Sequence, residues 1–297
     1  MGSDKLSGFK LFADCSTTVG EGPLWNAREK SLYWIDVFTG EVFRKRLSAS
    51  VNPSEFERFQ LNVGKIGGMV FAKDGGLLVF ASAGRVWNWL PGSEPTLRAE
   101  LKEAADTRFN DVIADPVGRV FCGVAPVVQG GKGSLWRMDA DGVFTCIEPS
   151  TEGMPNGLGF SPDRSKLYFT ETLGRTIYRY DYERITGAAT SKTALIKVPE
   201  TEGFPDGMTV DAEGCIWSAQ WNGSRLVRYS ESGEKLREWL FPIKKISCVA
   251  FGGSKLSTIF ITTANYPKDE ADYLSEKAGA VFMLKQSEFR GAQEFSI

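Results

Sequence analysis

Six short apolar segments of this chain start at matching positions, and the residues at those positions are the best candidates for chemistry. The segments recur every 40 to 50 residues, roughly the length of a propeller blade. The first residues are Glu21, Gly67, Asn110, Asn156, Asp206 and Ser247. A buried polar side chain at the start of an apolar strand is costly unless it has a partner. If these residues face one another, they form a ring with carboxylates, amides and a hydroxyl but no basic group.

Such a ring is suited to a metal ion. Two carboxylates that face each other in a narrow channel repel, and each raises the pKa of the other. A divalent cation removes the repulsion, and carboxylate and amide oxygens suit hard cations. We therefore predict one divalent ion (Ca²⁺, Mg²⁺, Mn²⁺ or Zn²⁺), held by Glu21, Asn156 and Asp206. Asn110 is either a fourth ligand or a partner of the substrate, and Ser247 is a weaker candidate. The alternative is a polar channel filled with water.

The composition excludes several other kinds of site. The chain has no histidine, which removes every triad, proton shuttle or zinc site that needs imidazole. Hydrolysis must then rely on carboxylates, amides, cations or a metal held by oxygen. The net charge of -2 offers no basic surface to nucleic acid or to an anionic membrane, so we expect neither as a partner.

The cysteines and the N-terminus predict a cytoplasmic protein. The five cysteines are odd in number and far apart, which is typical of reduced core residues. The N-terminus has no apolar segment like that of a signal peptide. No apolar run reaches the roughly 18 residues that a membrane helix needs.

The residues around each ring position repeat one order of elements. A short apolar strand, a turn, a second strand, a turn and a third strand are followed by a weaker fourth strand, as at 56–59 and 192–195. Turns at 73–76, 115–118, 161–164 and 211–214 carry Asp, Pro or Gly where hairpins need fixed or positive φ. The pattern predicts an all-β protein, a six-bladed β-propeller with a central metal site in the channel between its innermost strands.

We predict a single domain over residues 1–297, with blades starting near residues 21, 67, 110, 156, 206 and 247. Residues 8–14 contain an apolar strand without a blade of its own. We expect this strand to close the last blade, because closure removes open sheet edges. The alternative architecture is a sandwich or a pair of separate β domains.

Several stretches resemble the gluconolactonase, regucalcin (senescence marker protein) and luciferin-regenerating enzyme family. They are Gly20–Pro23 with Leu32–Asp36, Thr107–Asp111 with Asp115–Pro116, Pro155–Leu158 with Ser161–Asp163, Pro205–Met208 with Asp211–Gly214, and Phe251–Gly253. The resemblance implies a six-bladed propeller that hydrolyses sugar lactones. It also implies that Glu21, Asn156 and Asp206 bind the metal, that Asp206 is the general base, and that Arg108 and Asn110 contact the substrate.

The roles of individual residues leave alternatives open. A carboxylate bound to a cation is a weak base at neutral pH, so Asp206 either takes a proton from water or only orients the water. Arg108 stabilises the oxyanion or holds a substrate oxygen, unless it forms a salt bridge with Asp111. Trp221 and Phe109 either form an apolar wall for a sugar ring or belong to the core.

We therefore predict a metal-dependent hydrolase of sugar acid metabolism that opens the ester ring of an aldonolactone, a small molecule similar to gluconolactone. The stretch Ala125–Val128 stands where regucalcin-type members carry an acidic segment, so the particular sugar stays open. The alternatives are a phosphotriesterase of the diisopropylfluorophosphatase type and a non-catalytic calcium-binding propeller. The sequence does not predict the oligomeric state.

Overall fold

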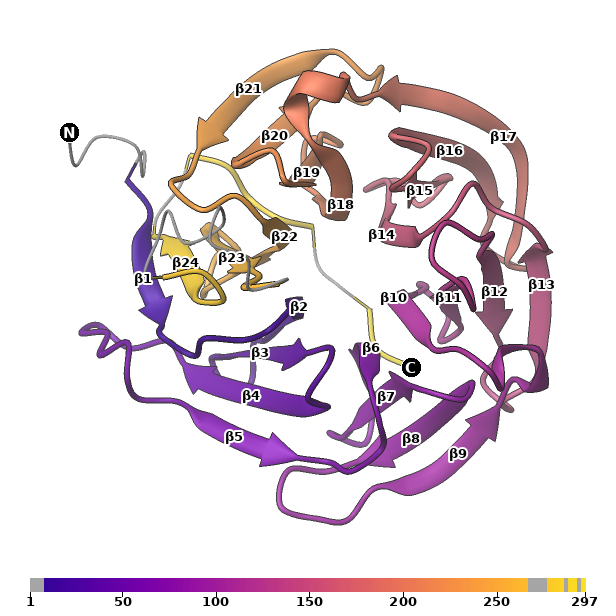
Figure 1. Cartoon of the computed structure of the whole chain (residues 1–297), viewed down its shortest axis with the longest axis horizontal. Helices are drawn as coiled ribbons and strands as arrows, with labels where there is room; N and C mark the ends of the chain where they lie inside the picture. The colour runs from indigo at the N-terminus through magenta and orange to yellow at the C-terminus, as the bar shows by residue number, and fades with distance from the viewer. Residues whose placement is uncertain (1–7, 267–276, 286–287, 293–294) are drawn as a thin grey trace.

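The strands form six sheets that surround a central opening (Figure 1). The structure is a computed structural model that describes residues 8–266, 277–285, 288–292 and 295–297. Each sheet has four strands, and neighbouring strands run antiparallel. This arrangement is a six-bladed β-propeller, which confirms the predicted all-β fold class.

The blades are numbered along the chain, and their strands are given from the channel outward. Blade 1 contains β2 (Gly20–Asn26), β3 (Ser31–Asp36), β4 (Glu41–Arg46) and β5 (Glu57–Gln60). Blade 2 contains β6 (Ile66–Phe71), β7 (Leu77–Ala81), β8 (Arg85–Trp89) and β9 (Thr96–Glu100). Blade 3 contains β10 (Phe109–Ala114), β11 (Val120–Val124), β12 (Ser134–Met138) and β13 (Phe144–Glu148). Blade 4 contains β14 (Pro155–Phe160), β15 (Lys166–Glu171), β16 (Thr176–Glu183) and β17 (Ala188–Lys197).

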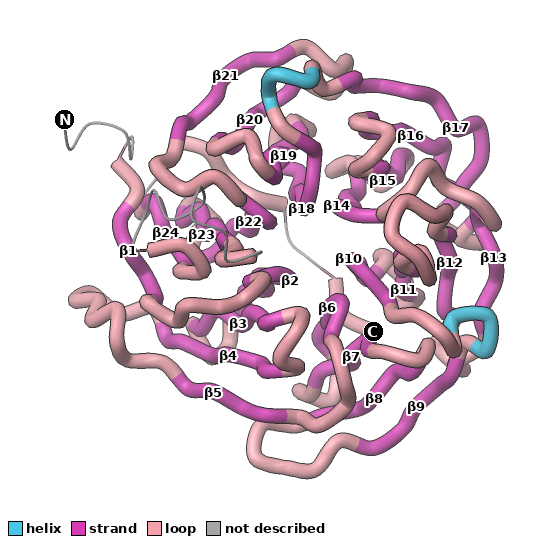
Figure 2. The backbone as a smooth tube through the Cα atoms, viewed as in Figure 1, coloured by secondary structure: helices cyan, strands magenta, loops and turns pink. Residues whose placement is uncertain are grey.

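The last two blades complete the ring. Blade 5 contains β18 (Phe204–Val210), β19 (Ile216–Trp221), β20 (Arg225–Tyr229) and β21 (Lys235–Leu240). Blade 6 contains β22 (Ile246–Gly252), β23 (Thr258–Thr263), β24 (Val281–Leu284) and β1 (Lys10–Ala13). Because β1 pairs with β24, residues from both ends of the chain share this sheet. Two short 3₁₀ helices, η1 (Lys102–Ala104) and η2 (Glu200–Glu202), lie between blades (Figure 2). Among the described residues, no helix has the length and apolar character that a membrane crossing requires.

The core lies between the blades, because both faces of each sheet are covered. Side chains along a strand point alternately to opposite faces. In β3, Leu32 and Trp34 pack in the apolar cluster shared with blade 6, whereas Tyr33 and Ile35 pack in the one shared with blade 2. A strand that is buried on both faces has a continuous apolar sequence. This explains why polar and apolar residues do not alternate in the repeat segments.

Each innermost strand has an irregular register where it faces the channel. The pairing shifts between Glu21 and Leu24, Ile66 and Gly68, Asn110 and Val112, Asn156 and Leu158, Pro205 and Met208, and Ile246 and Cys248. A β-bulge of this kind adds an unpaired residue, bends the strand and redirects side chains. The ring positions therefore lie at or beside a bulge in every blade, which the repeat pattern alone did not reveal.

Gly67 shows how closely neighbouring blades approach at the bulges. A Cβ atom at this position would lie 2.0 Å from the carbonyl oxygen of Phe109, which belongs to the next blade. The contact atom belongs to the backbone and has little freedom to move. Only glycine fits this position, so the ring residue of blade 2 supplies close packing rather than a functional side chain.

We expect Gly67→Ala to lower the free energy of unfolding by at least about 2 kcal/mol, because overpacking against backbone forces the blades apart. The matched control is Gly174→Ala, whose new methyl group meets the movable end of the Glu152 side chain. Urea unfolding of both variants measures the difference. Equal free energies of unfolding for the two variants would show that blades 2 and 3 can move apart at residue 67 without loss of stability.

Candidate functional site

The ring positions with ionisable or amide side chains meet at one end of the channel. Glu21, Asn156 and Asp206 come from the starts of β2, β14 and β18, and each is at most 7 % exposed. Burial is the main cause of the raised pKa of the Glu21 carboxyl, and the charges of Asp111 and then of Asp206 add to it, so the Glu21 and Asp206 carboxylates lie within electrostatic range of each other. The structure thus brings together three residues that are more than 40 residues apart along the chain.

A chain of hydrogen bonds joins blades 3, 4 and 5 at this end. The Arg108 guanidinium donates to Asn110 Oδ1 at 2.6 Å, and Asn110 Nδ2 donates to Asn156 Oδ1 at 3.2 Å. Asn156 Nδ2 donates to Thr172 Oγ1 at 3.0 Å, and that hydroxyl donates to the Pro205 carbonyl at 2.9 Å. Because arginine only donates, it fixes which end of the Asn110 amide faces it. The two amides are therefore held in set orientations beside Asp206.

A third carboxylate, that of Asp111, belongs to the same group. Burial raises its pKa from the ordinary value of 3.8 to about 7, although the positive charge of Arg108 acts against this shift. Asp111 is 8 % exposed, and it lies at the bulge of β10 directly after Asn110. Its charge in turn raises the pKa of both Glu21 and Asp206.

The other shifts in the group have the same main cause. Burial is the largest contribution to the raised pKa of Glu21 and also to that of Asp206. For Asp206, a hydrogen bond from Asn156 and the charge of Arg108 act in the opposite direction. For Glu21, hydrogen bonds from the Gly22 backbone N–H and the Cys248 thiol act in the opposite direction. These opposing contributions do not overcome the cost of burying three carboxylates together.

From the sequence, Asp111 is expected only as a possible salt-bridge partner of Arg108. Within the described residues, no ion pair joins the two side chains, and Arg108 Nη1 donates instead to Asn110 and to the Phe109 carbonyl. One signal could have identified Asp111. In four blades the residue after the ring position is glycine, whereas blades 3 and 6 carry Asp111 and Cys248 there.

Two further ring residues have structural roles. Ser247 is fully buried, and its hydroxyl donates to the Gly20 carbonyl at 2.5 Å and lies 3.0 Å from Thr262 Oγ1. This contact joins blade 6 to blade 1 and uses the single hydrogen of the hydroxyl. Gly67 has no side chain to offer, so the ring's functional side chains come from the remaining blades.

The two aromatic residues considered for a substrate wall lie in different environments. Phe109 is fully buried, with its ring centre 5.2 Å from that of Phe80 and 5.9 Å from that of Phe144, so it belongs to the core. Trp221 ends β19 and remains partly exposed while it packs against the apolar cluster of blades 1 and 2. The Lys245 ammonium lies 5.9 Å from the centre of its ring. Of the two, Trp221 alone keeps a surface that a ligand could contact.

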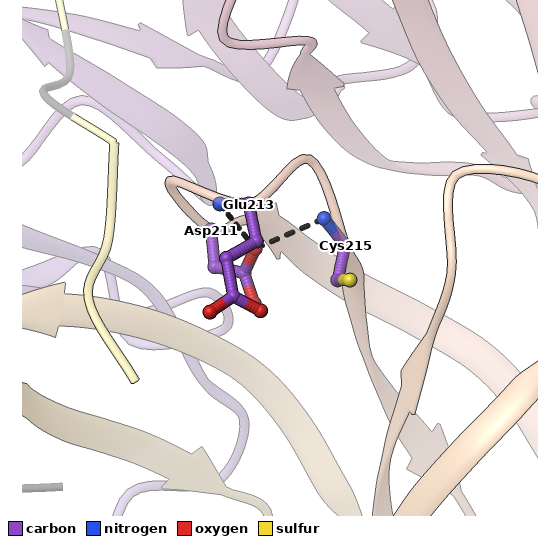
Figure 3. Close-up of side chains that lie close together, drawn as sticks. All are labelled: Asp211, Glu213 and Cys215. Carbon is purple, nitrogen blue, oxygen red and sulfur yellow. Dashed lines mark hydrogen bonds between the residues drawn. The ribbon is translucent and has the colours of Figure 1, made fainter. Parts of the chain in front are cut away.

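A second group with metal-ligating side chains consists of Asp211, Glu213 and Cys215 (Figure 3). Asp211 Oδ1 accepts the backbone N–H groups of Glu213 and Cys215, each at 2.9 Å. Asp211 Oδ2 accepts from Trp217 Nε1 and from Arg228 Nε, each at 2.8 Å. The guanidinium already neutralises Asp211 and also pairs with Glu213, so this group stabilises a turn and does not need a metal.

The donor set at the channel end does fit a divalent cation. Glu21, Asp111 and Asp206 supply carboxylates and Asn156 supplies an amide oxygen, and these are oxygen ligands of the kind that hard cations prefer. Among the described residues, the Arg108 guanidinium lowers the pKa of both Asp111 and Asp206 through its charge. One guanidinium against three buried carboxylates leaves excess negative charge that a divalent ion would neutralise.

The raised pKa values predict how the metal-free protein responds to pH. A folded-state pKa of about 7 for Asp111, above its ordinary 3.8, means that the folded chain keeps a proton that the unfolded chain releases. This stabilisation is present at low pH and is lost as the pH rises toward 7. In chelator, we expect the free energy of unfolding to fall by a few kcal/mol between about pH 5 and about pH 7.5, since one pKa unit corresponds to about 1.4 kcal/mol.

Urea titrations at several pH values measure this dependence, with Asp111→Asn as the comparison. The variant should lose much of the slope, because it removes one titrating group and lowers the pKa of its two neighbours. Added divalent metal at neutral pH should restore stability to the unmodified chain. A metal-free protein that is as stable at neutral pH as at acidic pH would contradict the electrostatic description of the site.

Comparisons with known proteins agree on one family. Residues 19–265 match the model of the SMP-30/gluconolactonase/LRE-like region. The chain is 42 % identical over 278 residues to the pentonolactonase XacC of Haloferax volcanii, which covers 91 % of this chain and 92 % of the relative. It is 33 % identical to the 6-deoxy-6-sulfogluconolactonase of Pseudomonas putida, with 84 % of each chain covered. The crystal structure of a calcium-binding protein, regucalcin, from Agrobacterium tumefaciens has a TM-score of 0.88 and 25 % identity, with 96 % of each chain covered. The chain belongs to the SMP-30/gluconolactonase/LRE-like family.

Proposed function

We propose that this protein is a divalent-metal-dependent lactonase that hydrolyses the ester ring of a sugar lactone. The observation that carries the proposal is the cluster of buried carboxylates beside Arg108 and the oriented amides. Such a cluster is electrostatically unfavourable without a cation, and it lies at the end of a propeller channel, where a small ligand can bind. Two relatives named as sugar lactonases support the reaction class.

Glu21, Asn156 and Asp206 would hold the metal. When bound, the ion polarises the lactone carbonyl, lowers the pKa of water and stabilises the charge of the tetrahedral state. Calcium, magnesium, manganese and zinc all remain in the proposal. The name of the regucalcin neighbour supports a divalent ion without selecting one. Asp111, next to the same carboxylates, would strengthen the attraction for the cation through its charge.

Arg108 and Asn110 would hold the substrate. Arg108 Nη1 donates hydrogen bonds to Asn110 and to the Phe109 carbonyl. Its Nε and Nη2 make no hydrogen bond to another described residue. Those nitrogens can donate to a lactone oxygen or to the developing oxyanion. The hydrogen bond to Arg108 leaves one lone pair on Asn110 Oδ1 for a sugar hydroxyl or the ion. Trp221 would cover one face of the sugar ring with its exposed surface.

Asp206 would act as the general base. Hydrogen bonds from Asn156 and from the Gly207 backbone N–H hold its carboxylate, so its orientation is fixed before substrate arrives. A bound cation and Arg108 would keep it ionised at neutral pH. It would take a proton from the attacking water and pass it to the ring oxygen as the acyl C–O bond breaks, and the new carboxylic acid then loses a proton to solvent. The product is an aldonate carboxylate and one released proton.

The substrate class is an aldonolactone with a five- or six-carbon sugar chain. The pentonolactonase relative points to the shorter lactones, and the sulfogluconolactonase relative to the longer ones. Both relatives are named as lactonases, which favours this reaction over a phosphotriesterase activity. The partner is thus a small molecule, and the distinction between sugars is left to a substrate panel.

A panel of pentono- and hexonolactones tests the reaction directly. We expect metal-dependent hydrolysis of at least one lactone, followed as proton release in weak buffer, and loss of activity in chelator. Asp206→Asn should lower kcat/KM by about a thousandfold or more and weaken metal binding. The control Glu213→Gln, in the turn cluster on another part of blade 5, should retain activity. Spontaneous rates for all lactones with each metal would refute the enzyme assignment.

A second substitution separates substrate contacts from metal binding. Arg108→Lys keeps the charge but removes the forked donors, so we expect kcat/KM to fall about a hundredfold. The affinity for the divalent ion should change little, because Arg108 is not among the proposed ligands. Steady-state kinetics and a metal titration on the same sample measure both effects. Unchanged kinetics would remove Arg108 from the substrate site.

A further inference from the structure

The Thr172 hydroxyl lies between two segments that carry proposed metal ligands. Thr172 directly follows β15 of blade 4 and is partly buried. Its oxygen accepts a hydrogen bond from Asn156 Nδ2 at 3.0 Å and donates to the Pro205 carbonyl at 2.9 Å. Pro205 directly precedes Asp206. One hydroxyl therefore links a proposed ligand in blade 4 to the residue before a proposed ligand in blade 5.

The backbone holds Thr172 in place independently of its side chain. Its N–H donates to the Met154 carbonyl at 3.1 Å, and its carbonyl accepts the Arg175 N–H at 3.0 Å. Met154 lies just before β14, the strand that carries Asn156. Because both backbone groups are hydrogen-bonded, a substitution that keeps the shape of the side chain removes the contacts of the hydroxyl and leaves the backbone anchored.

The single hydrogen of the Thr172 hydroxyl decides which end of the Asn156 amide can face it. A hydroxyl has one hydrogen to donate and two lone pairs that accept. The hydrogen is used on the Pro205 carbonyl, so the oxygen acts toward Asn156 only as an acceptor. The NH₂ end of the amide must then face Thr172, and the amide oxygen is left for other partners.

The contact on the other side of the Asn156 amide agrees with this orientation. Asn110 Nδ2 donates to Asn156 Oδ1 at 3.2 Å, and the Arg108 guanidinium orients Asn110 in turn. This bond uses one lone pair of Asn156 Oδ1, and the second can be offered to a cation. The bond to Thr172 is 3.0 Å long, so the hydroxyl is the closer of the two contacts that orient the amide.

We propose that Thr172 is a positioning residue that presents the amide oxygen of Asn156 to the metal. This inference rests on the proposed function, since it concerns a ligand named there. Without the hydroxyl, an N–H of the buried Asn156 side chain loses its acceptor, and the amide gains by turning toward another one. Groups that orient metal ligands in this way typically contribute about 10- to 100-fold to metal affinity.

Calorimetric titration of the chelator-treated protein with calcium, magnesium, manganese and zinc measures the role of Thr172. Thr172→Val keeps the shape of the side chain and removes the hydroxyl, so metal affinity should fall about tenfold or more. Thr172→Ser retains the hydroxyl and should bind within about threefold of the unmodified chain. Thr170→Val is the matched control. Thr170 is buried in β15, and its hydroxyl has no hydrogen-bond partner within the described residues, so this variant should keep the original affinity.

A double-mutant cycle separates the orientation of the amide from support of the fold. Asn156→Asp replaces the amide by a carboxylate, whose two oxygens are alike, so Thr172 has no end to select. Adding Thr172→Val to this variant should therefore lower metal affinity by less than about threefold. An equal loss in both backgrounds would show that Thr172 only supports the fold, and would overturn the proposal. If Asn156→Asp binds no metal, the comparison of Thr172→Val with Thr172→Ser decides.

Failure of this inference and failure of the proposed function give different results. If the unmodified protein binds no divalent ion, the proposed function is refuted and the role of Thr172 with it. If the unmodified protein binds an ion and Thr172→Val binds it equally well, only the role of Thr172 is overturned. Urea unfolding in chelator verifies that each variant is folded. Thr172→Ala, which adds no bulk, takes the place of Thr172→Val if the latter does not fold.

Discussion

The repulsion among three buried carboxylates is the interaction on which the rest of the site depends. Glu21, Asp111 and Asp206 come from three different blades, and burial raises the pKa of each. A folded protein does not retain such a group without compensation. Arg108 provides part of that compensation, and under the proposed function a divalent cation would supply the remainder. The same excess charge that makes the metal-free site unfavourable would make it selective for cations.

The propeller makes this convergence possible because its innermost strands all start at one end of the channel. Bulges at the ring positions and glycines at the closest approaches allow the strands to come near enough for their side chains to interact. The Ser247 contact to Gly20 and the pairing of β1 with β24 join the first and last blades. Among the described C-terminal residues, the Gly291 N–H donates to the Leu256 carbonyl of blade 6, and the Ile297 N–H donates to the Phe71 carbonyl of blade 2. Fold closure and site geometry are thus parts of one arrangement.

Much of this could be predicted from the sequence because the repeat carries its own register. A continuous apolar run such as Leu32–Ile35 identifies a strand buried on both faces, and its recurrence gives the number of blades. The register also predicted which residues share the channel end. It could not show the bulges, because these depend on pairing between strands. It therefore missed that Asp111, at the bulge after Asn110, belongs to the carboxylate cluster. The backbone contacts of Gly291 with Leu256 and of Ile297 with Phe71 were also missed, because they have no pattern in the sequence.

Calorimetric titration of the chelator-treated protein with divalent metals tests the central claim most directly. If the carboxylate cluster exists to hold a cation, at least one of calcium, magnesium, manganese and zinc should bind with a stoichiometry of one ion per chain. The double variant Glu21→Gln, Asp206→Asn should lose that binding while it remains folded. No binding of any of the four ions, or binding that survives in the double variant, would contradict the proposed role of the cluster.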